Sequence, residues 1–278
     1  MTCKSIPMEV ELTPRLGLKN FLKRSYPLHS AYKLFRDFRQ IPKERLTEIE
    51  SLRAITRVLP NTMLTMPRLF DLYDLVRQIN LQGLRGDLVE CGVWNGGAVG
   101  LMALANFRYP GPVRKLHLFD SFEGLPQPTK ADADIYSNYL LQVKADSAKA
   151  DDRAQLTAIG ACVGASQPAV EEFLIKRLGI KKDDLEFHVG WFQDTVPAAR
   201  ETLGEIALLR LDGDWYESTK ICISNLYDNV VMGGFVVIDD YGTFEGCRKA
   251  IDEFFDTRQI RPDYVHTDSD CVYFRKLQ

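Results

Sequence analysis

The sequence lacks the features that mark membrane, secreted and zinc-binding proteins. No apolar run in its 278 residues approaches the ~20 needed to cross a bilayer, and its first residues alternate charged and apolar types instead of forming a secretory signal. The six cysteines include no CxxC pair, and the four histidines are scattered. A net charge of −3 does not suit a nucleic-acid-binding surface. We therefore expect a cytoplasmic protein with no nucleic-acid partner and no membrane span.

From residue 86 onward the sequence alternates short apolar strands with helices. Strands are predicted at Asp87–Val93, Lys115–Asp120, Leu185–Val189, Ile206–Leu211, Gly234–Ile238, near Tyr264 and at Cys271–Arg275. Helices are predicted at Gly97–Asn106, Gln167–Leu178, Thr195–Ala199, Ser218–Val231 and Gly246–Thr257. This alternation is typical of the α/β class with a doubly wound, mostly parallel sheet.

Two stretches depart from this alternation. Residues 1–64 predict an N-terminal helical extension, whose basic and aromatic start favours packing on the main domain, or on a second subunit of a homo-oligomer, over contact with a membrane surface. Residues 127–164 are polar and too long for an ordinary connection. We expect them to form a lid or substrate-facing insertion within a domain that runs from 65 to 278.

Acidic residues follow two neighbouring strands at the point where each strand ends. Asp212 and Asp214 come after one strand, and Asp239 and Asp240 come directly after the next. The carboxyl ends of parallel strands face a shared crevice, so these carboxylates should converge. Four carboxylates repel each other unless a positive charge lies among them, and a hard divalent cation is the simplest one. The pattern therefore predicts a metal site.

A glycine-rich turn follows the first predicted strand of the sheet. Gly92, Gly96 and Gly97 allow a ligand to approach the backbone at the start of a helix, although their spacing is not the GxGxxG dinucleotide pattern. The next strand ends at Asp120, where an acidic residue holds a ribose diol in such folds. Asp120 and Ser121 also suit a helix N-cap. These two motifs predict an adenosine-containing ligand and leave NAD and S-adenosylmethionine open.

Five ordered motifs together resemble the macrocin-type O-methyltransferases, a family that includes sugar O-methyltransferases of antibiotic pathways. The motifs are Glu90-Cys-Gly-Val-Trp-Asn-Gly-Gly97, Phe119-Asp-Ser-Phe-Glu-Gly-Leu-Pro126, Gly190-Trp-Phe-Gln-Asp-Thr-Val-Pro197, Leu211-Asp-Gly-Asp-Trp-Tyr-Glu-Ser218 and Ile238-Asp-Asp-Tyr241. The resemblance implies a class I, Rossmann-like methyltransferase fold that uses S-adenosylmethionine and Mg²⁺.

The resemblance also implies which residues bind the cofactor. The methionine end would contact Glu90, Gly92, Trp94, Gly96 and Gly97. The ribose would contact Asp120 and Ser121, and the adenine would lie near Gly190, Trp191 and Phe192. The pair Thr65 and Met66 matches a family pair that reaches over the cofactor.

The chemistry of O-methylation assigns roles to the acidic residues. A hydroxyl must lose its proton as it attacks the sulfonium methyl, and a bound metal ion lowers its pKa. Asp212, Asp239 and Asp240 are the expected ligands, because their hard oxygen atoms suit Mg²⁺ or Mn²⁺. Asp214 is the expected catalytic base, and the roles of Asp212 and Asp214 are interchangeable at this stage.

The acceptor is expected to be a small molecule, and the resemblance favours a sugar hydroxyl in a secondary metabolite or polysaccharide. A phenolic hydroxyl is the next choice. Two other classes remain open: a nucleotide-dependent enzyme on the same sheet, and a non-catalytic member of the methyltransferase fold that acts as a partner subunit. The missing GxGxxG pattern counts against the first, and the intact acidic set counts against the second.

Overall fold

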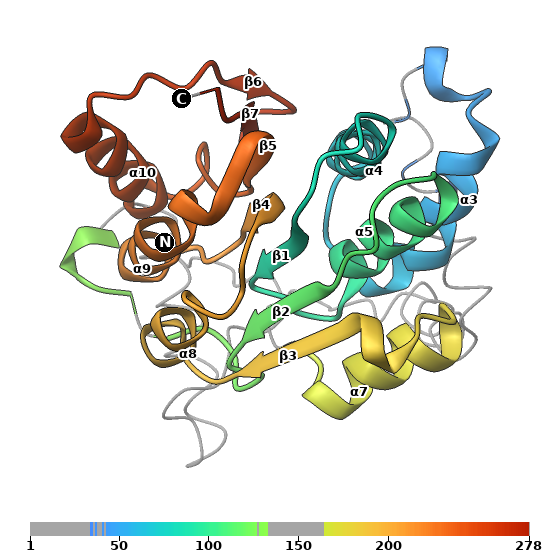
Figure 1. Cartoon of the computed structure of the whole chain (residues 1–278), viewed down its shortest axis with the longest axis horizontal. Helices are drawn as coiled ribbons and strands as arrows, with labels where there is room; N and C mark the ends of the chain where they lie inside the picture. Colours follow the sequence, from blue (N-terminus) through green and yellow to red (C-terminus); the bar gives the residue numbers. More distant parts are fainter. Residues whose placement is uncertain are drawn as a thin grey trace, which may run out of the picture.

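The fold centres on a seven-stranded sheet with strand order β3-β2-β1-β4-β5-β7-β6 (Figure 1). The computed structural model describes residues 34, 35, 37, 41, 43–126, 128–132 and 164–277. The strands are β1 Asp87–Cys91, β2 Leu116–Asp120, β3 Leu185–Val189, β4 Ile206–Leu211, β5 Val230–Ile238, β6 Val265–His266 and β7 Val272–Arg275. Strands β1 to β5 run parallel, whereas β7 is antiparallel to β5 and to β6. The predicted doubly wound, mostly parallel sheet is confirmed.

Helices cover both faces of this sheet, and each face has its own hydrophobic core (Figure 1). One face carries α3 Ile49–Val58, α4 Met66–Leu81, α5 Gly97–Arg108 and α7 Gln167–Glu172, which continues as a π-helical turn over Phe173–Arg177. The other face carries α8 Phe192–Ala199, α9 Tyr216–Leu226 and α10 Glu245–Arg258. Short 3-10 turns lie at Lys43–Arg45, Leu59–Asn61, Lys130–Asp132, Lys182–Asp184 and Tyr227–Asn229.

The largest error in the predicted boundaries lies between α9 and β5. The helix expected over Ser218–Val231 begins two residues earlier and ends at Leu226, and a 3-10 turn then leads directly into β5. Val230 is already a strand residue, because it pairs with Ile206 across a register shift in the β4–β5 ladder. The β-branched pair at 230 and 231 thus favours the strand, and β5 continues through the glycines at which the sequence had suggested that it begins.

The N-terminal part of the described chain packs into the same core as the sheet. Ile55 and Val58 of α3 are fully buried, and α3 lies against α4 and α5. The division at residue 64 stays a prediction. Most of the basic and aromatic start of the chain lies outside the described residues, as does most of the insertion over 127–164. No described helix combines the length and apolar character required to span a bilayer.

Candidate active site

The acidic residues meet at the carboxyl ends of the central strands β1, β4 and β5. The backbone N–H of Asp212 donates to the Cys91 carbonyl at 2.8 Å, and that of Asp239 donates to the Leu211 carbonyl at 2.9 Å. These hydrogen bonds continue the sheet by one residue, so the carboxylates leave it at neighbouring positions. The site therefore lies at the switch point between β1 and β4, where ligands bind in open α/β sheets.

A buried arginine that the sequence reasoning missed lies among these carboxylates. Arg210 lies on β4, two residues before Asp212, and is 2% exposed. Its Nη1 donates to Glu90 at 2.7 Å and to Asp212 at 2.8 Å, while Nη2 donates to Asp239 at 2.7 Å. Burial alone would lower the pKa of Arg210, but the three carboxylates raise it well above its ordinary value. Part of the positive charge expected from a metal ion is thus supplied by the chain itself.

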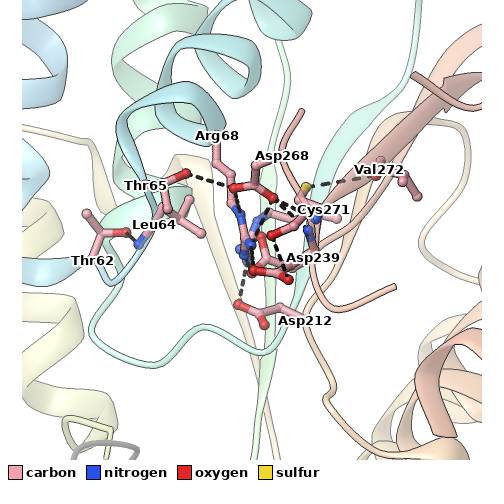
Figure 2. A network of polar contacts seen from close by, with 12 residues as sticks. Thr62, Leu64, Thr65, Arg68, Asp212, Asp239, Asp268, Cys271 and Val272 are labelled. Atoms are coloured by element: carbon pink, nitrogen blue, oxygen red, sulfur yellow. Dashed lines mark hydrogen bonds and ion pairs between the residues drawn. The ribbon is translucent and has the colours of Figure 1, made fainter. Parts of the chain in front are cut away.

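A second arginine reaches the site from α4. Arg68 donates from Nη1 to Asp239 at 2.8 Å, and its Nε and Nη2 form a fork on Asp268 at 2.7 and 3.1 Å (Figure 2). Nη2 also donates to Asp270 at 3.0 Å. Thr65 donates its hydroxyl to the same carboxylate of Asp268 at 3.0 Å (Figure 2). Arg68 thereby ties the start of α4 to β5 and to the β6–β7 loop.

These contacts distinguish Asp239 from the other predicted metal ligands. One carboxylate oxygen of Asp239 accepts from Arg210, and the other accepts from Arg68. By contrast, Asp212, Asp214 and Asp240 each offer a carboxylate oxygen within 4.8 Å of the others. Asp239 is absent from that group, although it lies beside it. The structure therefore gives Asp239 two fixed cations and brings together the other three carboxylates.

The group of three carboxylates has the chemistry of a site for a hard cation. It offers only oxygen atoms, and one of them, the buried Oδ2 of Asp240, has no hydrogen-bond partner among the described residues. Burial and repulsion from the neighbouring carboxylates raise the pKa of Asp214 and Asp240 well above their ordinary values. Such shifts are relieved when a divalent cation lies among the groups, so the residues present fit a metal ion.

The glycine-rich turn packs directly against the turn that carries Asp212. A side chain at Gly92 would overlap the Asp212 carbonyl, and its φ of +94° favours glycine. Asp120 closes the turn from β2: its Oδ2 accepts the N–H groups of Val93 and Trp94 at 2.7 and 3.1 Å. Its Oδ1 accepts the N–H of Phe122 at 2.7 Å. Asp120 thus holds a backbone in which Trp94 and Phe122 have positive φ.

Two adjoining cavities border these groups. The first is lined by the predicted residues Gly92, Trp94, Asp120, Ser121, Trp191, Phe192, Asp212 and Asp214. The second, of about 620 Å³, is lined by the predicted residues Glu90, Gly92, Trp94, Gly97, Asp212, Asp214, Asp239 and Asp240, and by Arg68 and Arg210. Its volume is within the ~300–1,000 Å³ range of small-molecule sites.

Four predicted cofactor residues do not line these cavities. Gly96 is the N-cap of α5, with φ +78°, and Gly190, with φ +140°, precedes Trp191 in the turn from β3 to α8. Met66 is 1% exposed and belongs to the core, and Thr65 is bonded to Asp268. Met63 lines both cavities instead. The cofactor roles of these four residues stay predictions.

Polar atoms without partners lie around the second cavity. Glu90 Oε2 and Trp94 Nε1 are buried and have no hydrogen-bond partner within the described part of the chain. Burial raises the pKa of Glu90 to about 8, against the opposite effect of Arg210. Buried polar atoms are normally satisfied, so an unpaired acceptor and an unpaired donor beside a cavity indicate a polar ligand.

The site can be compared with known proteins. A family model described as macrocin-O-methyltransferase (TylF) matches residues 19–276. The 8-demethyl-8-(2,3-dimethoxy-alpha-L-rhamnosyl)-tetracenomycin-C 4'-O-methyltransferase of Streptomyces olivaceus is 33% identical over 215 residues, or 77% of this chain and 75% of that protein. The mycinamicin III 3''-O-methyltransferase of Micromonospora griseorubida is 32% identical over 216 residues, or 78% of each.

A solved structure agrees with these relatives. The O-methyltransferase NovP superposes with a TM-score of 0.65 at 30% identity, over 78% of this chain and 83% of that one. The resemblance seen in the five sequence motifs is thereby confirmed, and the interpretation as a nucleotide-dependent enzyme on the same sheet is set aside. The chain belongs to the macrocin-O-methyltransferase family and is an S-adenosylmethionine-dependent O-methyltransferase.

Proposed function

We propose that the enzyme methylates a hydroxyl group of a sugar and uses Mg²⁺ or Mn²⁺ at Asp212, Asp214 and Asp240. The observation that carries the proposal is the convergence of these three carboxylates beside the cavity lined by the glycine-rich turn. Support for the acceptor comes from relatives whose names specify a rhamnosyl tetracenomycin and mycinamicin III. A small-molecule glycoside is therefore the proposed acceptor class.

The cofactor residues are proposed from the atoms that remain available. Glu90 has one oxygen on Arg210 and one without a described partner, which suits the ammonium group of the methionine end. Asp120 accepts three backbone N–H groups, which leaves one of its roughly four lone pairs for a ribose hydroxyl. Trp191 and Phe192 line the first cavity beside Asp120 and supply apolar surface for the adenine.

Hydrogen bonding also favours one of the two candidate bases. Burial raises the pKa of Asp212, but Arg210 holds one of its oxygens at 2.8 Å and opposes this rise. Asp214 has no arginine or lysine bonded to it among the described residues, and it offers one oxygen atom to the group of three carboxylates, which leaves its other oxygen for a proton. We assign proton removal from the acceptor to Asp214. Asp239, with an arginine on each oxygen, is assigned to the scaffold rather than to the ligand set.

The chemistry then follows from what these residues hold. When bound, the divalent cation lowers the pKa of the acceptor hydroxyl. Asp214 takes the proton as the hydroxyl oxygen attacks the methyl carbon, and the carbon–sulfur bond breaks to leave S-adenosylhomocysteine. The glycine-rich turn and Glu90 would hold the methionine end of the cofactor, beside the three carboxylates. Because Asp214 lines both cavities, the donor and the acceptor can meet at this residue.

Calorimetry with S-adenosylhomocysteine, and a turnover assay with rhamnosyl glycosides and with catechols, test the proposal. We expect cofactor binding in the presence of either Mg²⁺ or EDTA, and turnover of a glycoside with Mg²⁺ only. Asp240→Asn should reduce metal-dependent turnover more than about 100-fold, with the cofactor Kd within about twofold of the wild-type value. The control is Asp252→Asn, which removes a carboxylate that accepts from the Tyr241 hydroxyl outside both cavities.

Three outcomes would contradict parts of this proposal. Equal loss of cofactor binding and turnover in Asp240→Asn would show that the metal and cofactor sites are not separate. Full turnover in EDTA would show that the reaction needs no divalent cation. Preferential methylation of catechols would show that the acceptor is a phenol and not a sugar.

A further inference from the structure

A buried carboxylate joins the start of the predicted insertion to the turn that carries Asp214. Asp132 is 2% exposed. Its Oδ1 accepts the backbone N–H of Tyr216 at 2.6 Å. Its Oδ2 accepts the backbone N–H and the hydroxyl of Thr129 at 2.8 and 2.9 Å. Tyr216 is the first residue of α9, so the carboxylate also lies where the helix dipole favours negative charge.

A second hydrogen bond joins the same two segments. Trp215 Nε1 donates to the carbonyl oxygen of Pro126 at 2.9 Å. The Trp215 side chain is 1% exposed and packs edge-to-face on Phe244, with ring centroids 5.1 Å apart. Pro126 and Asp132 therefore hold the two residues that directly follow Asp214.

A glycine on α10 provides the space for Asp132. A Cβ on Gly246 would overlap Asp132 Oδ1 and would lie 3.0 Å from the Tyr216 nitrogen. Gly246 lies in the first turn of α10 and does not have a positive φ. Glycine inside a helix costs about 0.5–1 kcal/mol relative to alanine. The close approach of Asp132 supplies a physical reason for glycine at this position.

The backbone at Asp214 depends on its surroundings. Asp214 has a φ of +55°, in the left-handed region that glycine adopts readily and aspartate only occasionally. Such a conformation persists only where neighbouring contacts determine it. The backbone N–H of Trp215 donates to the Gly213 carbonyl at 2.6 Å across this turn, and the longer-range contacts that follow are those of Trp215 with Pro126 and of Tyr216 with Asp132.

We propose that Asp132 is a positioning residue for the methyl-transfer site. It holds the N-terminus of α9 so that Asp214 faces Asp212 and Asp240, although Asp132 itself lines neither cavity. This role rests on the proposed metal function of the three carboxylates. Gly246 is required for the same contact between Asp132 and α9, because any larger residue at this position displaces the Asp132 carboxylate.

Two substitutions disrupt the contact from opposite sides. Asp132→Ala removes the acceptor, and Gly246→Ala displaces it. In calorimetric titrations with Mn²⁺, each should weaken metal binding about tenfold, with the Kd of S-adenosylhomocysteine within about twofold of wild type. Hydrogen exchange followed by mass spectrometry should show faster exchange in peptides that cover residues 212–218, with or without metal.

The double variant tests whether both substitutions act through one contact. Once Asp132 is alanine, the methyl group at position 246 has no carboxylate to displace, so the double variant should bind Mn²⁺ no more weakly than Asp132→Ala. Asp132→Asn keeps one oxygen acceptor for Tyr216 and should restore most of the affinity. If Asp132→Ala does not fold, the comparison of Asp132→Asn with Gly246→Ala replaces it, with Gly246→Ala expected to have the larger effect.

Asn229→Ala is the control for a general loss of stability. Its side-chain amide donates to the carbonyls of Arg200 at 3.1 Å and Gly204 at 2.8 Å, at the amino ends of β4 and β5. We expect it to lower Tm without changing Mn²⁺ affinity. If the wild-type protein binds no Mn²⁺, the proposed function fails, and the exchange measurement alone tests Asp132. Unchanged exchange over 212–218, or additive effects in the double variant, would overturn the positioning role.

Discussion

Two groups of carboxylates lie side by side at the ends of the central strands, and they differ in how their charge is balanced. Asp239 and Asp268 are held by arginines at 2.7 to 3.1 Å. Asp214 and Asp240 have no arginine or lysine bonded to them in the described residues, and their pKa values are raised. The chain thus supplies cations where the scaffold needs them and leaves the adjacent group dependent on a bound ion.

The largest effect should come from removing Arg210, which is bonded both to Asp239 and to Asp212 beside Asp214 and Asp240. Arg210→Met leaves Glu90, Asp212 and Asp239 without their common cation. We expect the free energy of unfolding to fall by about 3–5 kcal/mol, as for other broken buried ion pairs. Urea unfolding followed by circular dichroism measures this change.

An exposed pair in the same chain is the matched control. Arg258 binds Asp228 at 2.6 and 3.0 Å, with both side chains more than a third exposed. Arg258→Met should lower the free energy of unfolding by less than about 1 kcal/mol. A similar loss of unfolding free energy in Arg210→Met and Arg258→Met would mean that the buried network stabilises the fold no more than an exposed ion pair does.

A smaller effect should separate the two adjacent aspartates. Asp239→Asn removes the charge between Arg68 and Arg210 and should lower the free energy of unfolding by about 1.5–3 kcal/mol, the range for hydrogen bonds to charged groups. Asp240→Asn should not lower it in metal-free buffer, because the substitution relieves repulsion from Asp212 and Asp214. Thermal and urea unfolding in EDTA compare the variants. A larger loss for Asp240→Asn would reverse the assignment of the two groups.

The smallest effect is a pH dependence that arises at Asp268. Burial alone would raise the pKa of Asp268, but Arg68 and the backbone N–H groups of Cys271 and Asp270 lower it to about 2. Because this value lies below the unfolded value of about 3.9, the stabilisation is complete above that pH and is lost as the pH falls toward 2. The stability difference between wild type and Asp268→Asn should therefore shrink between pH 5 and pH 2, as urea unfolding would measure. A constant difference would contradict the argument.

Local sequence patterns predicted most of the fold, because strands and helices of this class alternate with clear apolar periods. The error at Val230 arose because the helical pattern was extended across Tyr227–Asn229 into the first residues of the strand. The pairing of Val230 with Ile206 sets the start of β5. Such pairing joins residues distant in the chain and leaves no local signal.

The candidate site was only partly predictable for a similar reason. The acidic residues follow strand ends directly, so their convergence could be inferred. Arg210 had a signal in the sequence, since it is a single charge inside the buried strand Ile206–Leu211, and such a charge requires partners. Arg68 had none, because its partners Asp239 and Asp268 lie 171 and 200 residues away.

The contacts at the two ends of the predicted insertion determine how freely it can change length. One end is held by Pro126 and Asp132, and at the other Asn95 accepts the backbone N–H of Ala165 at 2.7 Å. For any loop between two fixed ends, doubling the number of residues costs only about 0.6 kcal/mol in loop-closure entropy. A change in the number of residues between these anchors should therefore leave the contacts at Pro126, Asp132 and Asn95 in place at little thermodynamic cost.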